Sequence, residues 1–194
     1  MKNTSKADFV NDADYPTQVG KGVDKWTCPF YKTWYSMKNR ACKVYSGVSV
    51  CEEWLVFSNF KGWMESQPHY GRQLDKDILG DGTLYSPETC VFVPAWINTL
   101  VVTQASARGK WPIGVHFRPT YPKPYQAQVS NGLGGKVHLG YHATPELAHE
   151  AYKAGKSAVV LDAIEHWKTC GLLDADSATV DALIEKYVEV EKYE

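Results

Sequence analysis

The sequence predicts an α+β protein of two small domains and a C-terminal helix, and three observations lead to this prediction. Between residues 73 and 100, two β-rich runs flank a glycine turn and lead directly into a helical stretch. Between residues 115 and 139, apolar and polar side chains alternate in three short runs, as in strands. Aromatic side chains recur at helical spacing before the first segment, and a capped helical pattern follows the second.

Composition narrows the class of protein. A chain of 194 residues with 44% hydrophobic residues can bury a core in each of two small domains. No run approaches the roughly 18 apolar residues of a membrane span, and the polar start at 1–6 has no apolar signal region behind it. The sequence therefore predicts a cytosolic protein that contacts no membrane. The net charge of −1 hides a basic middle, with 7 basic and 2 acidic residues in 104–160, and an acidic end, with 3 basic and 9 acidic residues in 161–194.

The first 102 residues divide into a polar arm and an aromatic domain. Residues 1–24 show no period of either 2 or 3.6 and are expected to form a loose arm. In the domain expected over 25–102, the spacing of Phe30, Trp34 and Met37 predicts one helix. A second helix is expected to begin near Glu52 and to carry an apolar face made of Trp54, Phe57 and Phe60. Both helices are expected to cover the strand segment that follows.

That segment is predicted to be a hairpin followed by a helix. The first strand carries Asp75 and Asp77, the chain turns at 80–82, and the second strand is the run 90–93. Pro94 suits the first turn of a helix over 95–100, because proline has no N–H to leave unpaired. The end of the first strand and the inner face of the helix would then converge, so Asp75 and Asn98 could bind one hard divalent cation. The alternative is that both acids simply flank a turn in a structural hairpin.

The motifs Leu74-Asp75-Lys76-Asp77, 85–93 and Ile97-Asn98 resemble the ββα-metal core of bacteriophage HNH homing endonucleases. The resemblance implies nicking of double-stranded DNA, a hydrolase activity in which Asp75 and Asn98 hold Mg²⁺ or Mn²⁺. Lys76 occupies the position of the histidine that activates water in that family, and a protonated lysine cannot accept a proton. A cation beside Lys76 could lower its pKa enough to leave a neutral fraction that acts as the base, or Asp77 or His69 could replace it. The alternative is a DNA-binding protein, derived from such nucleases, that no longer cuts.

Cysteine usage adds a second possible metal site. Four of the five cysteines fall in the first domain, at Cys28, Cys42, Cys51 and Cys90. The same HNH resemblance implies that these four bind one structural Zn²⁺, since relatives carry cysteines in matching motifs such as Val50-Cys51-Glu52-Glu53-Trp54. No Cys-x-x-Cys pair occurs, and the alternative is that the thiols are small buried apolar groups.

A small polar stretch over 103–110 is predicted to be a linker, and a second domain is predicted over 111–170. Its three alternating runs predict an antiparallel sheet with one apolar and one polar face. The polar face would carry His116, Arg118, Gln126, Gln128, Lys136 and His138. A helix capped by Thr144 is expected to run from Pro145 to about Lys168 and to cover the apolar face. Its contact residues are expected to be Leu147, Ala151, Tyr152, Ala158 and Ile164.

The motifs 113–118, 125–129, 137–141 and 144–152 resemble the DNA-binding domain of the Apetala/ethylene-response-factor type. The resemblance implies that the three-stranded sheet lies in the major groove of double-stranded DNA. Arginine and lysine can contact guanine or phosphate, and glutamine can contact adenine. His116 and His138 replace arginines and tryptophans of that family, so the base preference is open. The alternative is a protein-binding module with an ordinary polar face.

The end of the chain, 171–194, is predicted to hold an acidic helix capped by Ser177. Glu185, Glu189, Glu191 and Glu194 would repel phosphate, so this helix is expected to face away from DNA. It could serve as a brace, as a homodimer surface or as a contact for a host protein. The phage resemblance implies that the protein acts in the cytoplasm of an infected bacterial host.

Overall fold

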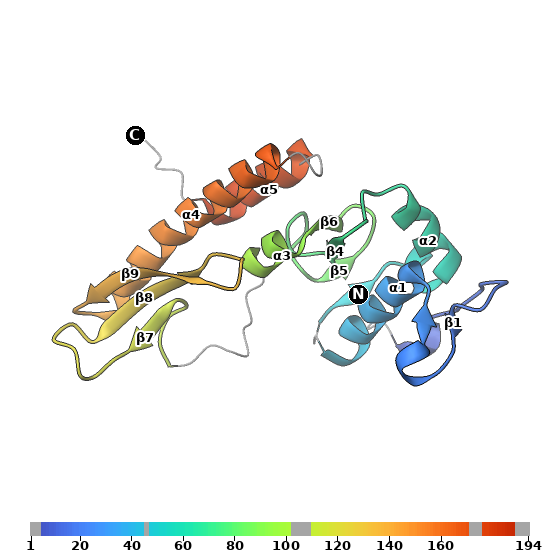
Figure 1. The fold of residues 1–194 in the computed structure, drawn as a ribbon, viewed down its shortest axis with the longest axis horizontal. Coiled ribbons are helices and arrows are strands. Elements are labelled where there is room, and N and C mark those ends of the chain that lie inside the picture. Colours follow the sequence, from blue (N-terminus) through green and yellow to red (C-terminus); the bar gives the residue numbers. More distant parts are fainter. Residues whose placement is uncertain (1–4, 45–46, 102–109, 171–175, 189–194) are drawn as a thin grey trace. The chain divides into compact units, whose positions relative to one another are not determined.

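The computed structural model describes residues 5–44, 47–101, 110–170 and 176–188, which form helices and small sheets (Figure 1). The α+β class expected from the sequence is confirmed. The chain divides into two compact units, Met1–Pro94 and Ala95–Glu194. No helix among the described residues is both long enough and apolar enough to cross a membrane. Residues 103–109 of the predicted linker, 103–110, lie outside the described residues.

The first unit consists of short elements joined by loops. In chain order these are η1 (Lys6–Asp8), β1 (Gln18–Val19), η2 (Gly22–Asp24), β2 (Trp26–Thr27), α1 (Pro29–Asn39), η3 (Arg40–Val44), β3 (Ser49–Val50), η4 (Glu53–Leu55), α2 (Phe57–Glu65), β4 (Arg72–Asp75), β5 (Leu84–Tyr85) and β6 (Val91–Pro94). Helices α1 and α2 pack against each other beside the strands. The strands pair as three separate two-stranded sheets, β1 with β2, β3 with β5 and β4 with β6.

The aromatic core of this unit follows the predicted helical spacing in α1 but not in the second helix. Trp34 and Met37 of α1 are buried, and the Trp34 Nε1 donates a hydrogen bond of 2.7 Å to the carbonyl oxygen of Trp54. The helix expected from Glu52 is instead broken in two, because Val56 adopts extended backbone between η4 and α2. Trp54 therefore belongs to a short 3₁₀ turn, while Phe57 and Phe60 belong to α2.

Within the described part of the N-terminal arm, residues 9–12 are docked rather than loose, which corrects the expectation from the polar sequence. Phe9 is buried and its ring meets the Trp34 ring edge-on at 5.5 Å. Val10 forms a parallel bridge with Val56. The Asp12 carboxylate accepts hydrogen bonds from the backbone nitrogen and the hydroxyl of Ser58, at 2.9 and 2.6 Å. The bond from the Ser58 backbone pairs an N–H group in the first turn of α2, which has no partner within the helix. Both bonds lower the pKa of Asp12.

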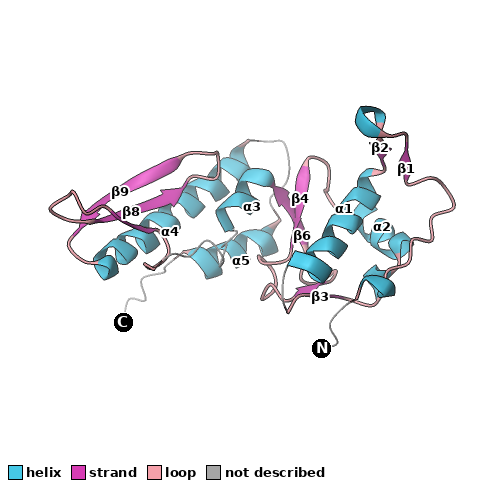
Figure 2. Cartoon of the chain, turned by 90° about the horizontal axis from the view of Figure 1, so that it is seen from below, coloured by secondary structure: helices cyan, strands magenta, loops and turns pink. Residues whose placement is uncertain are grey.

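The predicted hairpin is confirmed as an antiparallel pair, with Leu74 of β4 opposite Phe92 of β6 and Asp75 opposite Val91 (Figure 2). Pro94 ends β6 instead of starting the helix. The connection between the strands is longer than a simple turn, because it contains β5. That strand pairs in parallel with β3, with Ser49 opposite Leu84. Two-residue strands carry no detectable alternation, so this pair could not be predicted.

The second unit contains α3 (Ala95–Val101), the sheet β7 (Val115–Phe117), β8 (Tyr125–Ser130) and β9 (Lys136–His142), and the helices α4 (Pro145–Thr169) and α5 (Ser177–Tyr187). The sheet is antiparallel in the order β7-β8-β9, and α4 covers one face of it (Figure 1). The Thr144 side chain accepts from the Leu147 N–H at the start of α4, as predicted for its cap.

The contact between α4 and the sheet differs from the prediction at two positions. Leu147 is 54% exposed and Ala158 is exposed, whereas Ala148 is fully buried against the sheet. Small residues of α4, rather than the larger ones expected, face the sheet here because the helix lies close to it. A Cβ on Gly155 would lie 2.4 Å from the Leu139 side chain.

Helix α3 belongs to the second unit, although the sequence placed it in the first. Lys156 of α4 donates from Nζ to the carbonyl oxygen of Leu100, and Tyr187 of α5 donates from its hydroxyl to that of Val101 at 3.3 Å. The last carbonyl groups of a helix have no partner within the helix, so both bonds satisfy the end of α3. Burial lowers the pKa of Lys156 to about 8.

The last described helix is a brace within this unit. Val180 and Leu183 of α5 are buried, and α5 packs on α4. Asp176, not Ser177, is its N-cap, because its carboxylate accepts from the backbone nitrogen and hydroxyl of Thr179 at 2.8 and 2.6 Å. The predicted helix end at Gly171 and the acidic residues beyond 188 lie outside the described residues.

Candidate nucleic-acid interface and predicted metal sites

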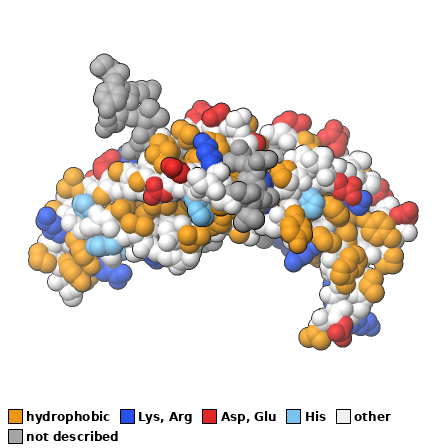
Figure 3. Space-filling model, turned by 45° about the horizontal axis from the view of Figure 1, so that its top comes forward, with side chains coloured by type: hydrophobic (Ala, Val, Ile, Leu, Met, Phe, Trp, Pro, Cys, Tyr) orange, Lys and Arg blue, Asp and Glu red, His pale blue; other side chains and the backbone are white. Residues whose placement is uncertain are grey.

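The polar face of the sheet carries all six residues predicted to contact DNA. His116 lies opposite Gln126 in the β7–β8 register, and Gln128 lies opposite His138 in the β8–β9 register. Alternate residues of a strand share a face, so these side chains lie opposite the buried Ala127 and away from α4. Lys136 is opposite Ser130 on the same side, and Arg118 follows β7 directly. At the left end of Figure 3, over the second unit, basic and histidine side chains lie among hydrophobic ones.

Hydrogen bonds join five of these six side chains into two groups. The Gln128 Nε2 lies 2.7 Å from the His116 Nε2. The Arg118 Nε donates to the Gln126 Oε1 at 3.0 Å, and the Gln126 Nε2 lies 3.3 Å from the His138 Nδ1. Each glutamine amide is therefore held by a neighbouring strand rather than free to rotate. A ligand that binds these amides would order less side-chain motion than one that binds free glutamines.

Arg118 and Lys136 are the two permanent cations of this face. An amide nitrogen can only donate, so its contact with the His116 Nε2 requires that this ring nitrogen be unprotonated. Partial burial is the main cause that lowers the pKa of His116, and the positive charges of Lys136 and Arg118 lower it further. At neutral pH the face thus combines two cations with a neutral imidazole and two oriented amides.

A β-bulge adds an aromatic residue to the face that the sequence did not predict. The register places Gln126 opposite Tyr141 but Gln128 opposite His138, so β9 holds one extra residue at this point. Gly140 sits there with a φ of +103°, a conformation that other residues rarely adopt. The bulge directs Tyr141 to the polar face, where its ring stacks on that of Tyr121 at 4.3 Å. Glycine inside a strand pattern was the available signal for this bulge.

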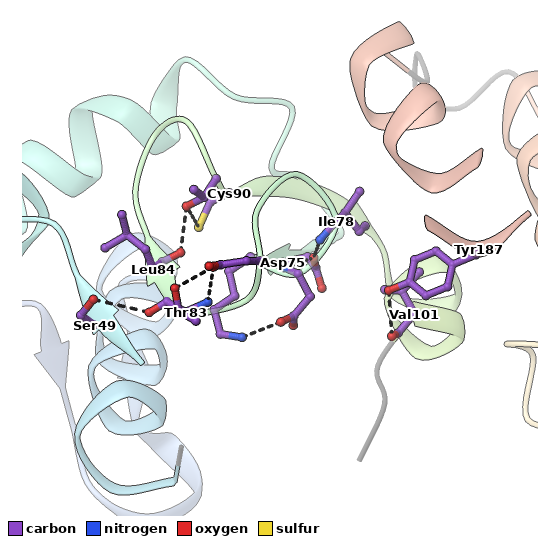
Figure 4. A network of polar contacts seen from close by, with 12 residues as sticks. Ser49, Asp75, Ile78, Thr83, Leu84, Cys90, Val101 and Tyr187 are labelled. Carbon is purple, nitrogen blue, oxygen red and sulfur yellow. Dashed lines mark hydrogen bonds and ion pairs between the residues drawn. The ribbon is translucent and has the colours of Figure 1, made fainter. Parts of the chain in front are cut away.

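In the first unit, Asp75 closes the loop that follows β4. Its side chain is buried at 3% exposure, and Oδ1 accepts hydrogen bonds from the backbone nitrogens of Asp77 and Ile78, at 2.7 and 2.8 Å (Figure 4). Burial raises the pKa of Asp75, although the two backbone bonds act in the opposite direction. One carboxylate oxygen is thus already used to hold the chain reversal.

Lys76 and Asp77 form an ion pair in the same loop. Lys76 is 7% exposed, and its Nζ lies 2.7 Å from the Asp77 Oδ1 and 5.6 Å from the centre of the Tyr85 ring. Gly82 allows this packing, because a Cβ there would lie 2.4 Å from the Asp77 Oδ1. The residue at the predicted position of the general base therefore supports the loop through a partly buried ion pair.

The other two predicted catalytic residues do not belong to this loop. The His69 ring is half-buried and packs against Phe30 and Phe92, with ring centres 5.2 and 6.1 Å apart, so it lies at the edge of the aromatic core. Asn98 lies on α3, in the second unit. The loop after β4 thus gathers Asp75, Lys76 and Asp77, without His69.

The four cysteines predicted to bind zinc lie in or beside different elements of the first unit. Cys28 is the N-cap residue of α1, and Cys42 lies in η3 near Lys38 and Lys6. Cys51 and Cys90 are close enough to affect each other, and burial raises the pKa of the Cys90 thiol to about 12. Among the described residues, no group of three or more His, Cys, Asp or Glu side chains is placed to hold a metal ion. Zinc at these cysteines stays a prediction.

The chain was also compared with known proteins. No protein-family model, curated protein or solved structure matches it. The resemblances to HNH nucleases and to Apetala-type domains stay predictions based on the motifs quoted above.

Proposed function

We propose that this protein binds double-stranded DNA through the polar face of the sheet β7–β9. The observation that supports the proposal is the presence of six DNA-compatible side chains, from three adjacent strands and the residue that follows β7, on one exposed face of the sheet. Arginine and lysine can contact phosphates or guanine, and a glutamine amide matches the donor and acceptor pair of adenine. Since His116 and Arg118 hold the two amides, the face is partly organised before it binds.

Loss of the two cations of this face should weaken DNA binding in a salt-dependent way. Each phosphate contact contributes about 0.9 to the slope of log K against log salt, because a counterion is released. We expect the double variant Arg118→Ala, Lys136→Ala to lower that slope by about 2. Fluorescence anisotropy of a labelled duplex, titrated at several KCl concentrations, measures the slope directly.

The matched control removes two lysines from the helices of the same unit. Lys168 of α4 and Lys186 of α5 are exposed, so their replacement by alanine changes the net charge equally. We expect the slope of this control to equal that of the wild-type chain. Equal losses in both double variants would mean that general charge, not this face, attracts DNA. Absence of salt-dependent binding by the wild-type chain would refute the proposal.

Metal-dependent nicking is a second candidate, favoured by the order of the elements β4, β6 and α3, in which β6 leads into α3 without a loop. We expect slow nicking of supercoiled plasmid with Mg²⁺ or Mn²⁺, since loss of a general base typically lowers a rate by roughly 10²–10⁴-fold. Asp75→Asn should abolish it while it keeps the two backbone hydrogen bonds of the loop. If wild type and Asp75→Asn leave bound plasmid equally intact, DNA binding without cleavage is the function.

A further inference from the structure

Tyr121 and Tyr141 form an exposed aromatic stack at one end of the polar face. Their ring centres are 4.3 Å apart and their planes differ by 12°. The Tyr141 ring also packs edge-to-face with the His138 ring, with ring centres 4.9 Å apart. Tyr121 is 46% exposed. Tyr121 is therefore the more exposed ring of the stack.

The loop that carries Tyr121 is held in one conformation. Three prolines, Pro119, Pro122 and Pro124, restrict its backbone, because each fixes its own φ. The Arg118 N–H donates to the Pro124 carbonyl oxygen at 2.7 Å, and the Tyr121 N–H donates to that of Arg118 at 3.1 Å. A ring on such a loop loses little freedom when a ligand stacks on it.

The groups beside the stack suit a nucleotide. Gln126 lies opposite Tyr141 in the sheet register, and the Arg118 Nε donates to the amide oxygen of Gln126. An aromatic plane, a guanidinium and an amide thus lie together at this end of the face. These are the groups with which proteins stack an unpaired base, neutralise its phosphate and bind its edge.

Away from its ends, a fully paired duplex offers no base face for the exposed ring of Tyr121 to stack on. Its base faces are covered by neighbouring bases, and only base edges are accessible in the grooves. We propose that Tyr121, backed by Tyr141, is a stacking site for an unpaired base. The sheet would then prefer duplex DNA that carries an unpaired base over fully paired duplex. This inference rests on the proposed DNA-binding function of the same face.

The test compares two labelled duplexes that differ by one extrahelical base, each titrated with the full chain. We expect the wild-type chain to bind the duplex with the unpaired base about tenfold more tightly, the order of one base–aromatic stack. Tyr121→Ala should lose this preference but keep its affinity for the paired duplex, whereas Tyr121→Phe should keep both. Tyr70→Ala, which removes an exposed tyrosine of the first unit, should behave as wild type.

A fluorescent base analogue at the unpaired position gives a readout that needs no variant. Stacking on Tyr121 should quench its fluorescence when the wild-type chain binds. Equal affinity of the wild-type chain for the two duplexes, no quenching, or an equal loss on both duplexes in Tyr121→Ala would each overturn the inference while DNA binding stands. If the wild-type chain shows salt-dependent binding to neither duplex, the proposed function itself fails.

Discussion

Replacing Gly114 by alanine should destabilise the second unit by about 3–5 kcal/mol, which is a large part of the stability of a small domain. Two causes add. Gly114 has a φ of +80°, where a residue with a Cβ is strained by roughly 1–2 kcal/mol. A Cβ there would also lie 2.0 Å from the Tyr152 ring, at an atom next to its attachment point. The ring cannot yield there without displacing α4 from the sheet.

Gly134→Ala is the matched control for this substitution. Gly134 has a similar φ of +85° in the same unit, but a Cβ there would meet no atom within 4 Å. We expect it to cost only the backbone strain, about 1 kcal/mol. Urea unfolding followed by far-UV circular dichroism measures both variants. Equal midpoints would show that Tyr152 moves aside and that the close contact does not fix the position of α4.

Asp75→Ala should destabilise the first unit by about 2–4 kcal/mol, because it leaves two backbone N–H groups of the loop after β4 without their acceptor. The Ile78 N–H is buried, so water cannot replace the lost carboxylate oxygen there. Asp75→Asn keeps an oxygen at the same place and should stay within about 1 kcal/mol of wild type at pH 7. The free energy of unfolding of the three chains decides between these outcomes.

The difference in free energy of unfolding between Asp75→Asn and wild type, measured as a function of pH, tests the raised pKa of the buried Asp75 carboxyl group. The pKa of Asp75 is higher in the folded chain than in the unfolded chain. The stability that Asp75 contributes is therefore fully present at pH values below its pKa in the unfolded chain. That contribution is lost as pH rises through the folded pKa. Asparagine does not titrate, so Asp75→Asn should gain stability relative to wild type as pH rises from acid to neutral. A constant difference across this range would contradict a raised pKa.

This pair of variants also makes the nicking assay interpretable. Asp75→Ala removes a metal ligand candidate and the support of the loop together, so lost activity would have two explanations. Asp75→Asn removes the negative charge and keeps the loop. A nicking defect in a variant of unchanged stability would therefore concern the reaction and not the fold.

The candidate DNA interface was accessible to sequence reasoning because its signals are local. Strict alternation in three runs predicted the three strands and the six residues of the polar face, and the structure places them there. Thr144 and Pro145 marked the start of α4 for a similar reason, since a helix cap acts within one turn. Tyr121 and Tyr141 were missed because alternation stops at the bulge around Gly140, and because a loop residue has no period.

By itself, the sequence determined the α+β class, the hairpin β4–β6, the sheet β7–β9 and the helices α1 and α4, since each depends on a periodic pattern or a cap among neighbouring residues. Only the tertiary structure decided what depends on distant residues. The arm packs on Val56 and Ser58, and α3 joins the second unit through Lys156. Asp75 shows most clearly what a residue type alone does not determine. Its residue type fits both a metal ligand and a loop acceptor, and the buried Ile78 N–H assigns one of its oxygens to the loop.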